Sequence, residues 1–185
     1  TFNNNIANNA GTGANSDAFG GAVRLSAQLV MVTNNYFYQN QTTNGGSGEN
    51  AGGAISNGSE TTINRTIFSG NSGKNGGAIK TNGTTFIANS LFYNNSATNV
   101  GGAIDFSNAT GRVVFSTIAF NTASTGAGVY GETGGIQYVT ACVLYNNDSK
   151  DTAESAGDVQ LGSCYYESTV GAGVTSVFGN VQGSD

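Results

Sequence analysis

A glycine motif returns along the chain at nearly constant spacing, and this repeat constrains the fold more than any other feature. Three copies, Gly52-Gly53-Ala54-Ile55, Gly76-Gly77-Ala78-Ile79 and Gly101-Gly102-Ala103-Ile104, lie 24 and 25 residues apart. An earlier copy is Gly20-Gly21-Ala22-Val23, and degenerate later copies are Gly126-Ala127-Gly128-Val129 and Ala156-Gly157-Asp158-Val159. A period of this length is typical of solenoids, in which each repeat packs on its neighbours.

A second motif runs in phase with the glycines: a large apolar residue is followed three positions later by asparagine. The apolar members are Phe2, Phe37, Phe68, Phe92, Ile118, Leu144 and Val177. The asparagines are Asn5, Asn40, Asn71, Asn95, Asn121, Asn147 and Asn180. Two further columns accompany the middle copies: apolar Val32, Ile63, Ile87, Val113 and Val139, and small or polar Asn35, Thr66, Ser90, Ser116 and Cys142.

These columns predict an all-β fold, a right-handed parallel β-helix (β-solenoid) of about seven coils with 24–26 residues and three short strands per coil. Equivalent residues of successive coils then stack on one another. We expect the core stack to contain Phe37, Phe68, Phe92, Ile118, Leu144, Val177, Ile55, Ile79, Ile104 and Val129. We expect the seven asparagines to form a structural ladder, because a side-chain amide both donates and accepts hydrogen bonds.

The composition favours β-strands and argues against several classes of binding partner and catalytic or metal site. Only 9% of residues are charged, no proline is present, and 37% are hydrophobic, which suits central strands that donate to a ladder. The net charge of −5 and the six scattered Lys and Arg residues argue against nucleic acid and anionic membranes. No apolar run approaches a membrane span, so we expect no direct membrane insertion. The lack of histidine excludes Ser-His-Asp catalysis and histidine metal sites.

The spacing between the asparagine turn and the glycine motif grows in some coils. The extra residues predict inserted loops near 10–18, 41–50 and 148–155, and loops added at one corner of a solenoid often mark a binding face. Neutral variation at a tolerant corner is the alternative. We expect residues 1–185 to form a single β-helix domain. Because neither end has an evident cap, we expect a fragment of a longer solenoid or a subunit that stacks end to end.

Few residues suggest a metal-binding site or a covalent cross-link. Asp148, Asp151, Glu154 and Asp158 are a candidate Ca²⁺ site, although a solvated acidic loop is the simpler interpretation. Cys142 and Cys164 lie about one coil apart, which predicts either a disulfide or two buried thiols.

Enzymatic activity and ice binding have weaker support in the sequence. Asp105, Glu132 and Glu60 fall at unrelated places in their coils, so we expect no paired carboxylates and no enzymatic activity. Ice binding would need regular threonine columns. Thr61-Thr62 and Thr84-Thr85 begin such a pattern, which ends in the following coils. We expect no metal and no cofactor.

The paired glycine and Phe-x-x-Asn motifs resemble the repeats of the polymorphic outer membrane protein family, which are β-helical autotransporter passengers. The resemblance covers nearly the whole chain, and related repeats occur in other bacterial surface β-helices. It implies export to the extracellular space or bacterial cell surface and adhesion to a host-cell surface protein or matrix component. We therefore expect a non-enzymatic adhesin passenger or its stalk. A self-assembling fibre subunit, associating through its coil ends, is the alternative, followed by a carbohydrate-active enzyme or an ice-binding protein.

Overall fold

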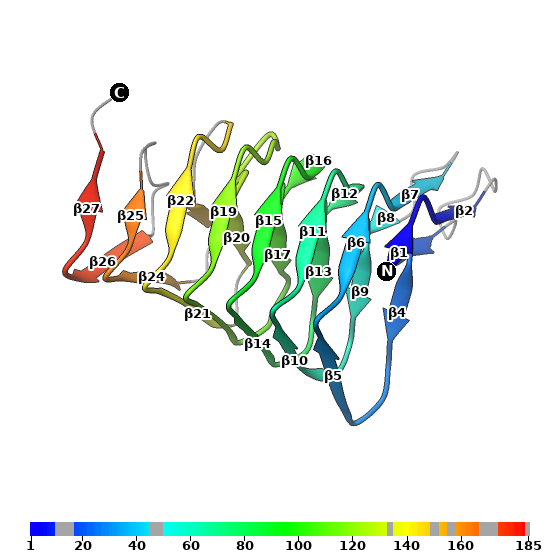
Figure 1. Cartoon of the computed structure of the whole chain (residues 1–185), viewed down its shortest axis with the longest axis horizontal. Coiled ribbons are helices and arrows are strands. Elements are labelled where there is room, and N and C mark those ends of the chain that lie inside the picture. Colours follow the sequence, from blue (N-terminus) through cyan, green and yellow to red (C-terminus); the bar gives the residue numbers. More distant parts are fainter. Residues whose placement is uncertain are drawn as a thin grey trace.

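The protein is a rod of stacked coils in a computed structural model that describes residues 1–9, 17–44, 50–132, 135–148, 152–154, 158–166 and 174–183. Successive coils lie side by side along the long axis, with the N-terminal coils at one end and the C-terminal coils at the other (Figure 1). Every strand pairing given by the described residues is parallel. The predicted all-β parallel β-helix is therefore confirmed. Among these residues no helix is long and apolar enough to cross a membrane.

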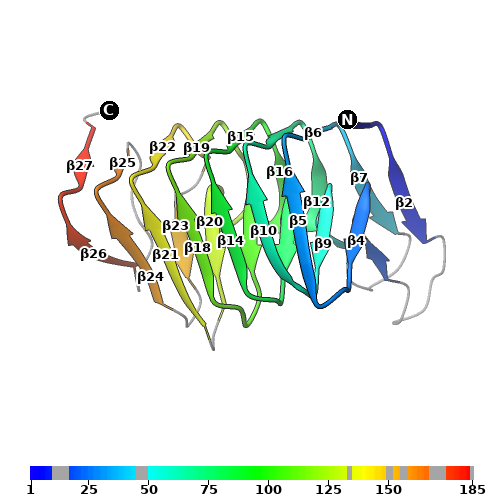
Figure 2. The ribbon, with the colours of Figure 1, turned by 60° about the horizontal axis from the view of Figure 1, so that its bottom comes forward.

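Four sheets run along the rod, and each takes one strand or part-strand from successive coils (Figures 1 and 2). Sheet A contains β1 (Phe2–Asn3), β6 (Tyr36–Tyr38), β11 (Ile67–Ser69), β15 (Leu91–Tyr93), β19 (Thr117–Ala119), β22 (Val143–Tyr145), β25 (Tyr165–Tyr166) and β27 (Val181–Gln182). Sheet B contains β2 (Ile6–Asn9), β7 (Gln41–Asn44), β12 (Ser72–Asn75), β8 (Asn50–Ala51), β3 (Ala18–Phe19) and β16 (Ser96–Val100). Sheet C contains β4 (Val23–Leu25), β9 (Ile55–Asn57), β13 (Ile79–Thr81), β17 (Ile104–Phe106), β20 (Val129–Gly131) and β23 (Thr152–Glu154). Sheet D contains β5 (Leu29–Thr33), β10 (Glu60–Asn64), β14 (Thr85–Ala88), β18 (Gly111–Val114), β21 (Ile136–Thr140), β24 (Asp158–Gly162) and β26 (Val174–Phe178).

The predicted apolar columns lie in register inside the rod. Phe37, Phe68 and Phe92 are paired strand to strand, and their rings stack nearly parallel with centroids 4.9 and 4.8 Å apart. The Ile and Val columns of sheets C and D are equally buried and join the same core. Stacking identical side chains at the strand spacing leaves little space between coils, and such close packing is what protein interiors require.

The number of strands per coil differs from the prediction. Sequence patterning indicated three, whereas a middle coil has four, because β12 and β16 add sheet B between the asparagine turn and the glycine motif. These strands read Ser-Gly-Lys-Asn and Ser-Ala-Thr-Asn-Val. Apart from Val100, they lack the large apolar residues that usually signal a strand. Their backbone pairing to the neighbouring coils nevertheless supplies the hydrogen bonds that buried backbone requires.

The two glycines of the repeated motif have different roles. The first, as at Gly76, adopts φ of +66°, a conformation that costs residues with a Cβ more than it costs glycine. The second, as at Gly77, packs against the next coil: a Cβ there would lie 2.1 Å from the carbonyl oxygen of Gly102. The motif therefore turns the chain and admits the close approach of adjacent coils.

The last coils are shorter than the repeat predicts, and this moves two apolar residues, Val159 and Val177, to other columns. Val159 lies in sheet D opposite Gln137, whereas the strand opposite Val129 is β23. Val177 lies in β26 of sheet D, at an irregularity of the register, so it does not share the sheet A column of Phe92. In sheet A, the Phe92 column continues through Leu144 to Tyr166 and Gln182. The apolar-x-x-Asn match at Val177 therefore fell in sheet D and not in sheet A.

The predicted loops fall partly on strands. Residues 10–16, 45–49, 149–151 and 155 lie outside the described residues. Gln41–Asn44 is strand β7, Ala18 begins β3, and Thr152–Glu154 is strand β23. The extra spacing had marked these segments as loops, but a β-helix accepts polar strands because only their backbone must pair.

Candidate functional site

The asparagine ladder is the most regular polar feature, and its role is structural. In Asn40, Asn71, Asn95 and Asn121, the backbone N–H and the side-chain Nδ2 both donate to Oδ1 of the asparagine in the next coil, over 2.9–3.0 Å. Nδ2 also donates to a carbonyl of the previous coil, as from Asn95 to Phe68 (3.0 Å). Asn5 and Asn147 occupy the two ends of this run. The stacked side-chain amides thus supply hydrogen-bond partners to the buried backbone groups at this corner.

Asn180 belongs to a different column, so its assignment to the ladder was wrong. Its Oδ1 accepts a hydrogen bond from the backbone N–H of Cys164 (2.8 Å). In the same way, the hydroxyls of Ser90 and Ser116 accept from the residues below them. Asn180 therefore continues the small polar column that begins at Asn35. The physical cause is again the short final coil, which places this asparagine at the small polar position, five residues before the ladder position of the regular coils.

Cys142 and Cys164 occupy consecutive positions in that small polar column, and both are buried free thiols. The Sγ of Cys142 donates to the carbonyl of Thr140 (3.2 Å), as the hydroxyl of Ser116 donates to Val114 (2.8 Å). The neighbouring thiol and burial raise the pKa of Cys142, whereas the hydrogen bond from Cys142 lowers the pKa of Cys164 to about 7. The structure therefore has the buried-thiol arrangement, not the disulfide.

The four acidic residues considered for Ca²⁺ do not form a site in the described part of the chain. Asp148 is exposed just after β22, and Asp151 lies outside the described residues. Glu154 and Asp158 belong to different sheets, C and D. No group of three or more metal-ligating side chains occurs among the described residues.

Asp105 and Glu132 occupy different places in their coils, since Asp105 pairs with Tyr130, but they interact electrostatically. Asp105, on β17, is fully buried, and its Oδ2 accepts a hydrogen bond from Ser107 (3.1 Å). Its Oδ1 has no hydrogen-bond partner among the described residues. Burial raises the pKa of Asp105 to about 7, Lys80 opposes this rise, and Glu132 adds to it. Strand register in sheet C places Lys80 beside Asp105, and Glu132 follows β20 in the next coil. Sequence spacing within single coils does not show this grouping.

Of the four threonines that suggested an ice-binding face, Thr61 and Thr85 point into the rod, Thr62 is half-buried and Thr84 is exposed. Thr61 and Thr85 are buried, and both bond the side chain of Asn57, over 2.9 and 3.0 Å. Thr81 joins the same group through Thr85 (2.7 Å). These hydroxyls satisfy one another at the corner between sheets C and D, so they do not form a regular threonine face toward water.

The outer face of sheet A, with the turns beside it, carries more large exposed apolar side chains than any other described face. They are Tyr36, Ile67, Tyr93, Phe115, Phe120, Val143, Tyr145 and Val181. Phe120 lies between Tyr93 and Tyr145, with ring centroids 5.4 Å from each in edge-to-face contact. We call these three side chains the aromatic row. The sequence signal for this face was the alternation of side chains along a strand, because the residues on either side of a buried Phe, Ile or Leu point outward.

No protein-family model, curated protein or solved structure matches the chain.

Proposed function

We propose that this chain is a non-enzymatic adhesive rod of the bacterial surface that binds a protein partner through the outer face of sheet A. The aromatic row carries the proposal. Tyr93, Phe120 and Tyr145 are 39%, 37% and 38% exposed although they touch one another across three successive coils. Contiguous exposed apolar patches on soluble proteins mark interaction sites more often than isolated apolar residues do.

The chemistry of this face suits protein recognition. Tyr and Phe are enriched at protein interfaces, and large aromatic anchors supply much of the binding energy there. Here the row stands on a parallel sheet whose backbone is fixed by the coils on either side. Because little side-chain and backbone freedom remains to be lost on binding, the entropic cost of association is reduced.

The repeat motifs support the surface setting of this proposal. Their resemblance to polymorphic outer membrane protein repeats implies export as an autotransporter passenger and display outside the cell. A rod of stacked coils (Figure 1) would carry its binding face along its length. The partner would then be a host-cell surface protein or a matrix component.

The structure supplies substitutions that remove two of the three members of the aromatic row without straining the backbone. Phe120 has φ of +55°, and Asn94 and Asn146 occupy the same place in the neighbouring coils, so Phe120→Asn places a residue that tolerates this conformation. Tyr93→Ser copies Ser69, its partner in the adjacent strand. The matched control is Phe86→Thr on sheet D, which copies Thr62 and removes an equally exposed phenylalanine.

The test is binding of the purified chain to cultured epithelial cells and to a coat of extracellular matrix protein. We expect the double variant Phe120→Asn/Tyr93→Ser to lose at least about tenfold in affinity, the loss of one modest anchor or more. Phe86→Thr should bind as the parent does. Absence of binding by the parent chain to either surface would refute the proposal, and so would equal binding by parent and double variant.

A further inference from the structure

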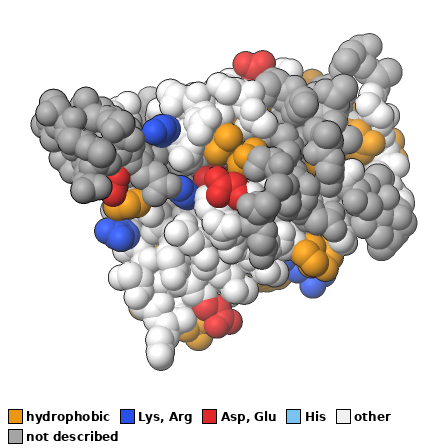
Figure 3. Space-filling view, turned by 180° about the vertical axis from the view of Figure 1, so that it is seen from behind, with side chains coloured by type: hydrophobic (Ala, Val, Ile, Leu, Met, Phe, Trp, Pro, Cys, Tyr) orange, Lys and Arg blue, Asp and Glu red, His pale blue; other side chains and the backbone are white. Residues whose placement is uncertain are grey.

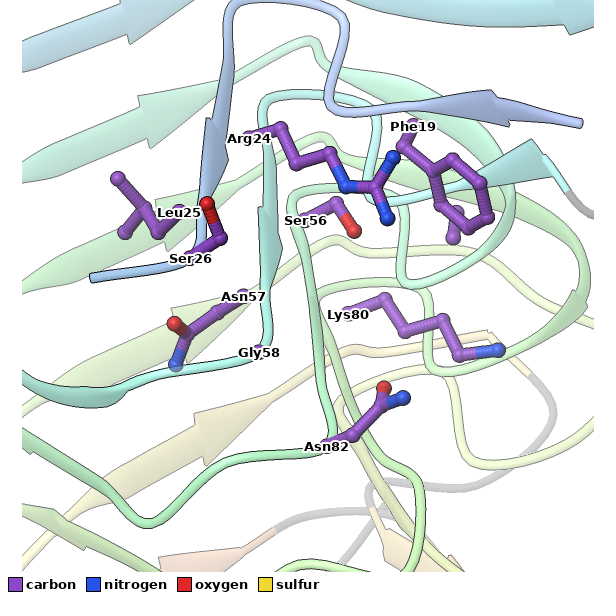
Figure 4. A pocket seen from close by; sticks show the side chains of 10 residues that line it. Phe19, Arg24, Leu25, Ser26, Ser56, Asn57, Gly58, Lys80 and Asn82 are labelled. Atoms are coloured by element: carbon purple, nitrogen blue, oxygen red, sulfur yellow. The ribbon is translucent and has the colours of Figure 1, made fainter. Parts of the chain in front are cut away.

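An amine and a carboxyl group are neighbours on the outer side of sheet C. Lys80 on β13 and Asp105 on β17 are paired residues of adjacent parallel strands, so their side chains leave the same face of the sheet about 4.8 Å apart. Glu132 follows β20, the next strand, and interacts electrostatically with Asp105. Seen from behind, basic and acidic groups stand close to each other near the middle of the rod (Figure 3). The Lys80 side chain extends along this side of the sheet (Figure 4).

This pair is buried although it lies on an outer face. Lys80 is 6% exposed and Asp105 is 0% exposed. The next residue of the same column, Tyr130, is also buried and forms a small apolar cluster with Val100. Water is therefore largely excluded from the amine and the carboxyl group, and two buried charges lose much of the solvation that they have in water. A neutral amide in their place would not carry that cost.

The two oxygens of the Asp105 carboxyl group have different surroundings. Oδ2 accepts a hydrogen bond from the Ser107 hydroxyl (3.1 Å), whereas Oδ1 has no hydrogen-bond partner among the described residues. Burial raises the pKa of Asp105 to about 7, so part of its population is the neutral acid at neutral pH. An amine can attack the carbonyl carbon of a neutral carboxylic acid, whereas the charge of a carboxylate opposes that attack.

We propose that Lys80 and Asp105 join in an intramolecular isopeptide bond, a covalent cross-link between two adjacent coils. Glu132 takes one proton from the Lys80 ammonium, and the resulting amine attacks Cγ of the neutral Asp105 carboxyl group. The Nζ–Cγ bond forms and the Cγ–Oδ1 bond breaks. Oδ1 leaves as water, with its own proton and a second proton from Nζ. Oδ2 remains as the amide oxygen, to which the Ser107 hydroxyl already donates.

The fold itself supplies what this reaction requires. Nothing is oxidised or reduced, and the extra proton stays on Glu132, so no outside reagent takes part. Strand register holds the amine beside the carboxyl group, which makes their encounter intramolecular. Glu132 has the role of a general base, and its carboxylate lies one strand further along the same sheet. In chains that have not reacted, Asp105 remains a titratable acid.

The test is the mass of the purified chain, measured by mass spectrometry after denaturation. We expect the folded chain, incubated at neutral pH, to become lighter than its sequence by the mass of one water molecule. Proteolysis should then release one branched peptide that contains both Lys80 and Asp105. A chain that is incubated in urea, where the two strands are not paired, should keep its full mass. Retention of the full mass by the folded chain after prolonged incubation would overturn the proposal.

Variants locate the bond. Lys80→Arg keeps a positive charge but removes the amine, so it should keep the full mass. Lys74→Arg, on sheet B, is the matched control and should lose water as the parent does. Glu132→Gln, at a half-buried residue, retains both reacting groups and should form the bond at least about tenfold more slowly, because the proton acceptor is lost. Loss of water by Lys80→Arg would show dehydration elsewhere in the chain and overturn the cross-link. An unchanged rate in Glu132→Gln, with circular dichroism showing that the variant is folded, would overturn the role of Glu132.

Discussion

Asn95 is the residue whose replacement most directly tests the ladder. Its side chain accepts hydrogen bonds from the backbone N–H and Nδ2 of Asn71 (3.0 and 2.9 Å). It donates to the carbonyl of Phe68 and to Oδ1 of Asn121 (both 3.0 Å). Asn95→Ala removes these four bonds at a site that is 0% exposed, where water cannot replace them. At about 1 kcal/mol net for each bond, the variant should lose about 4 kcal/mol of unfolding free energy.

Urea denaturation followed by circular dichroism measures this loss, and the thermal midpoint should fall by about 8–16 °C for a chain of this size. The control is the neighbouring exposed Asn94, which has φ of +53°. Asn94→Gly copies Gly70, which has the same place in the preceding coil, and should change stability by less than about 1 kcal/mol. Similar losses in the two variants would refute the ladder as a source of stability.

Three further predictions concern the core, a buried acid and the thiols. Phe92→Ala should cost about 3–5 kcal/mol in urea denaturation, and the exposed Tyr93→Ala far less; the reverse order would contradict the inward stack. The folded-state pKa of Asp105, about 7, lies above the ordinary aspartate value of 3.8, so the folded protein binds the proton more tightly. Stability should therefore be greatest below about pH 4 for this group and fall by about 4 kcal/mol as pH rises through 7. Asp105→Asn should flatten that profile, and an unchanged profile would exclude Asp105 as its source. Cys142→Ser copies Ser116 one coil earlier and should keep the thermal midpoint within a few degrees; a large fall would show that the sulfur itself is required.

The sequence by itself determined the coil and its inner columns. The spacing of Gly76, Phe92 and Asn95 from their counterparts sets the period, and a parallel stack at constant spacing brings like residues into contact. Because the middle coils have nearly equal lengths, the predicted partners Phe68–Phe92 and Asn71–Asn95 are the observed ones. The spacing of the repeat is sufficient to predict these pairs, since each coil contacts mainly its neighbours.

The tertiary structure alone decided what lies between coils of unequal length and on the outer faces. Asn180 and Val177 moved to other columns because the final turns are shorter, and only the paired register reveals where a chain closes a turn. The approach of Asp105 to Lys80 and Glu132, and of Arg24 to Phe19, joins residues from different strands or sheets. Outward residues need not repeat from coil to coil, because no neighbouring coil packs on them. Their groupings therefore leave no periodic signal in the sequence and appear only when the strands are placed beside one another.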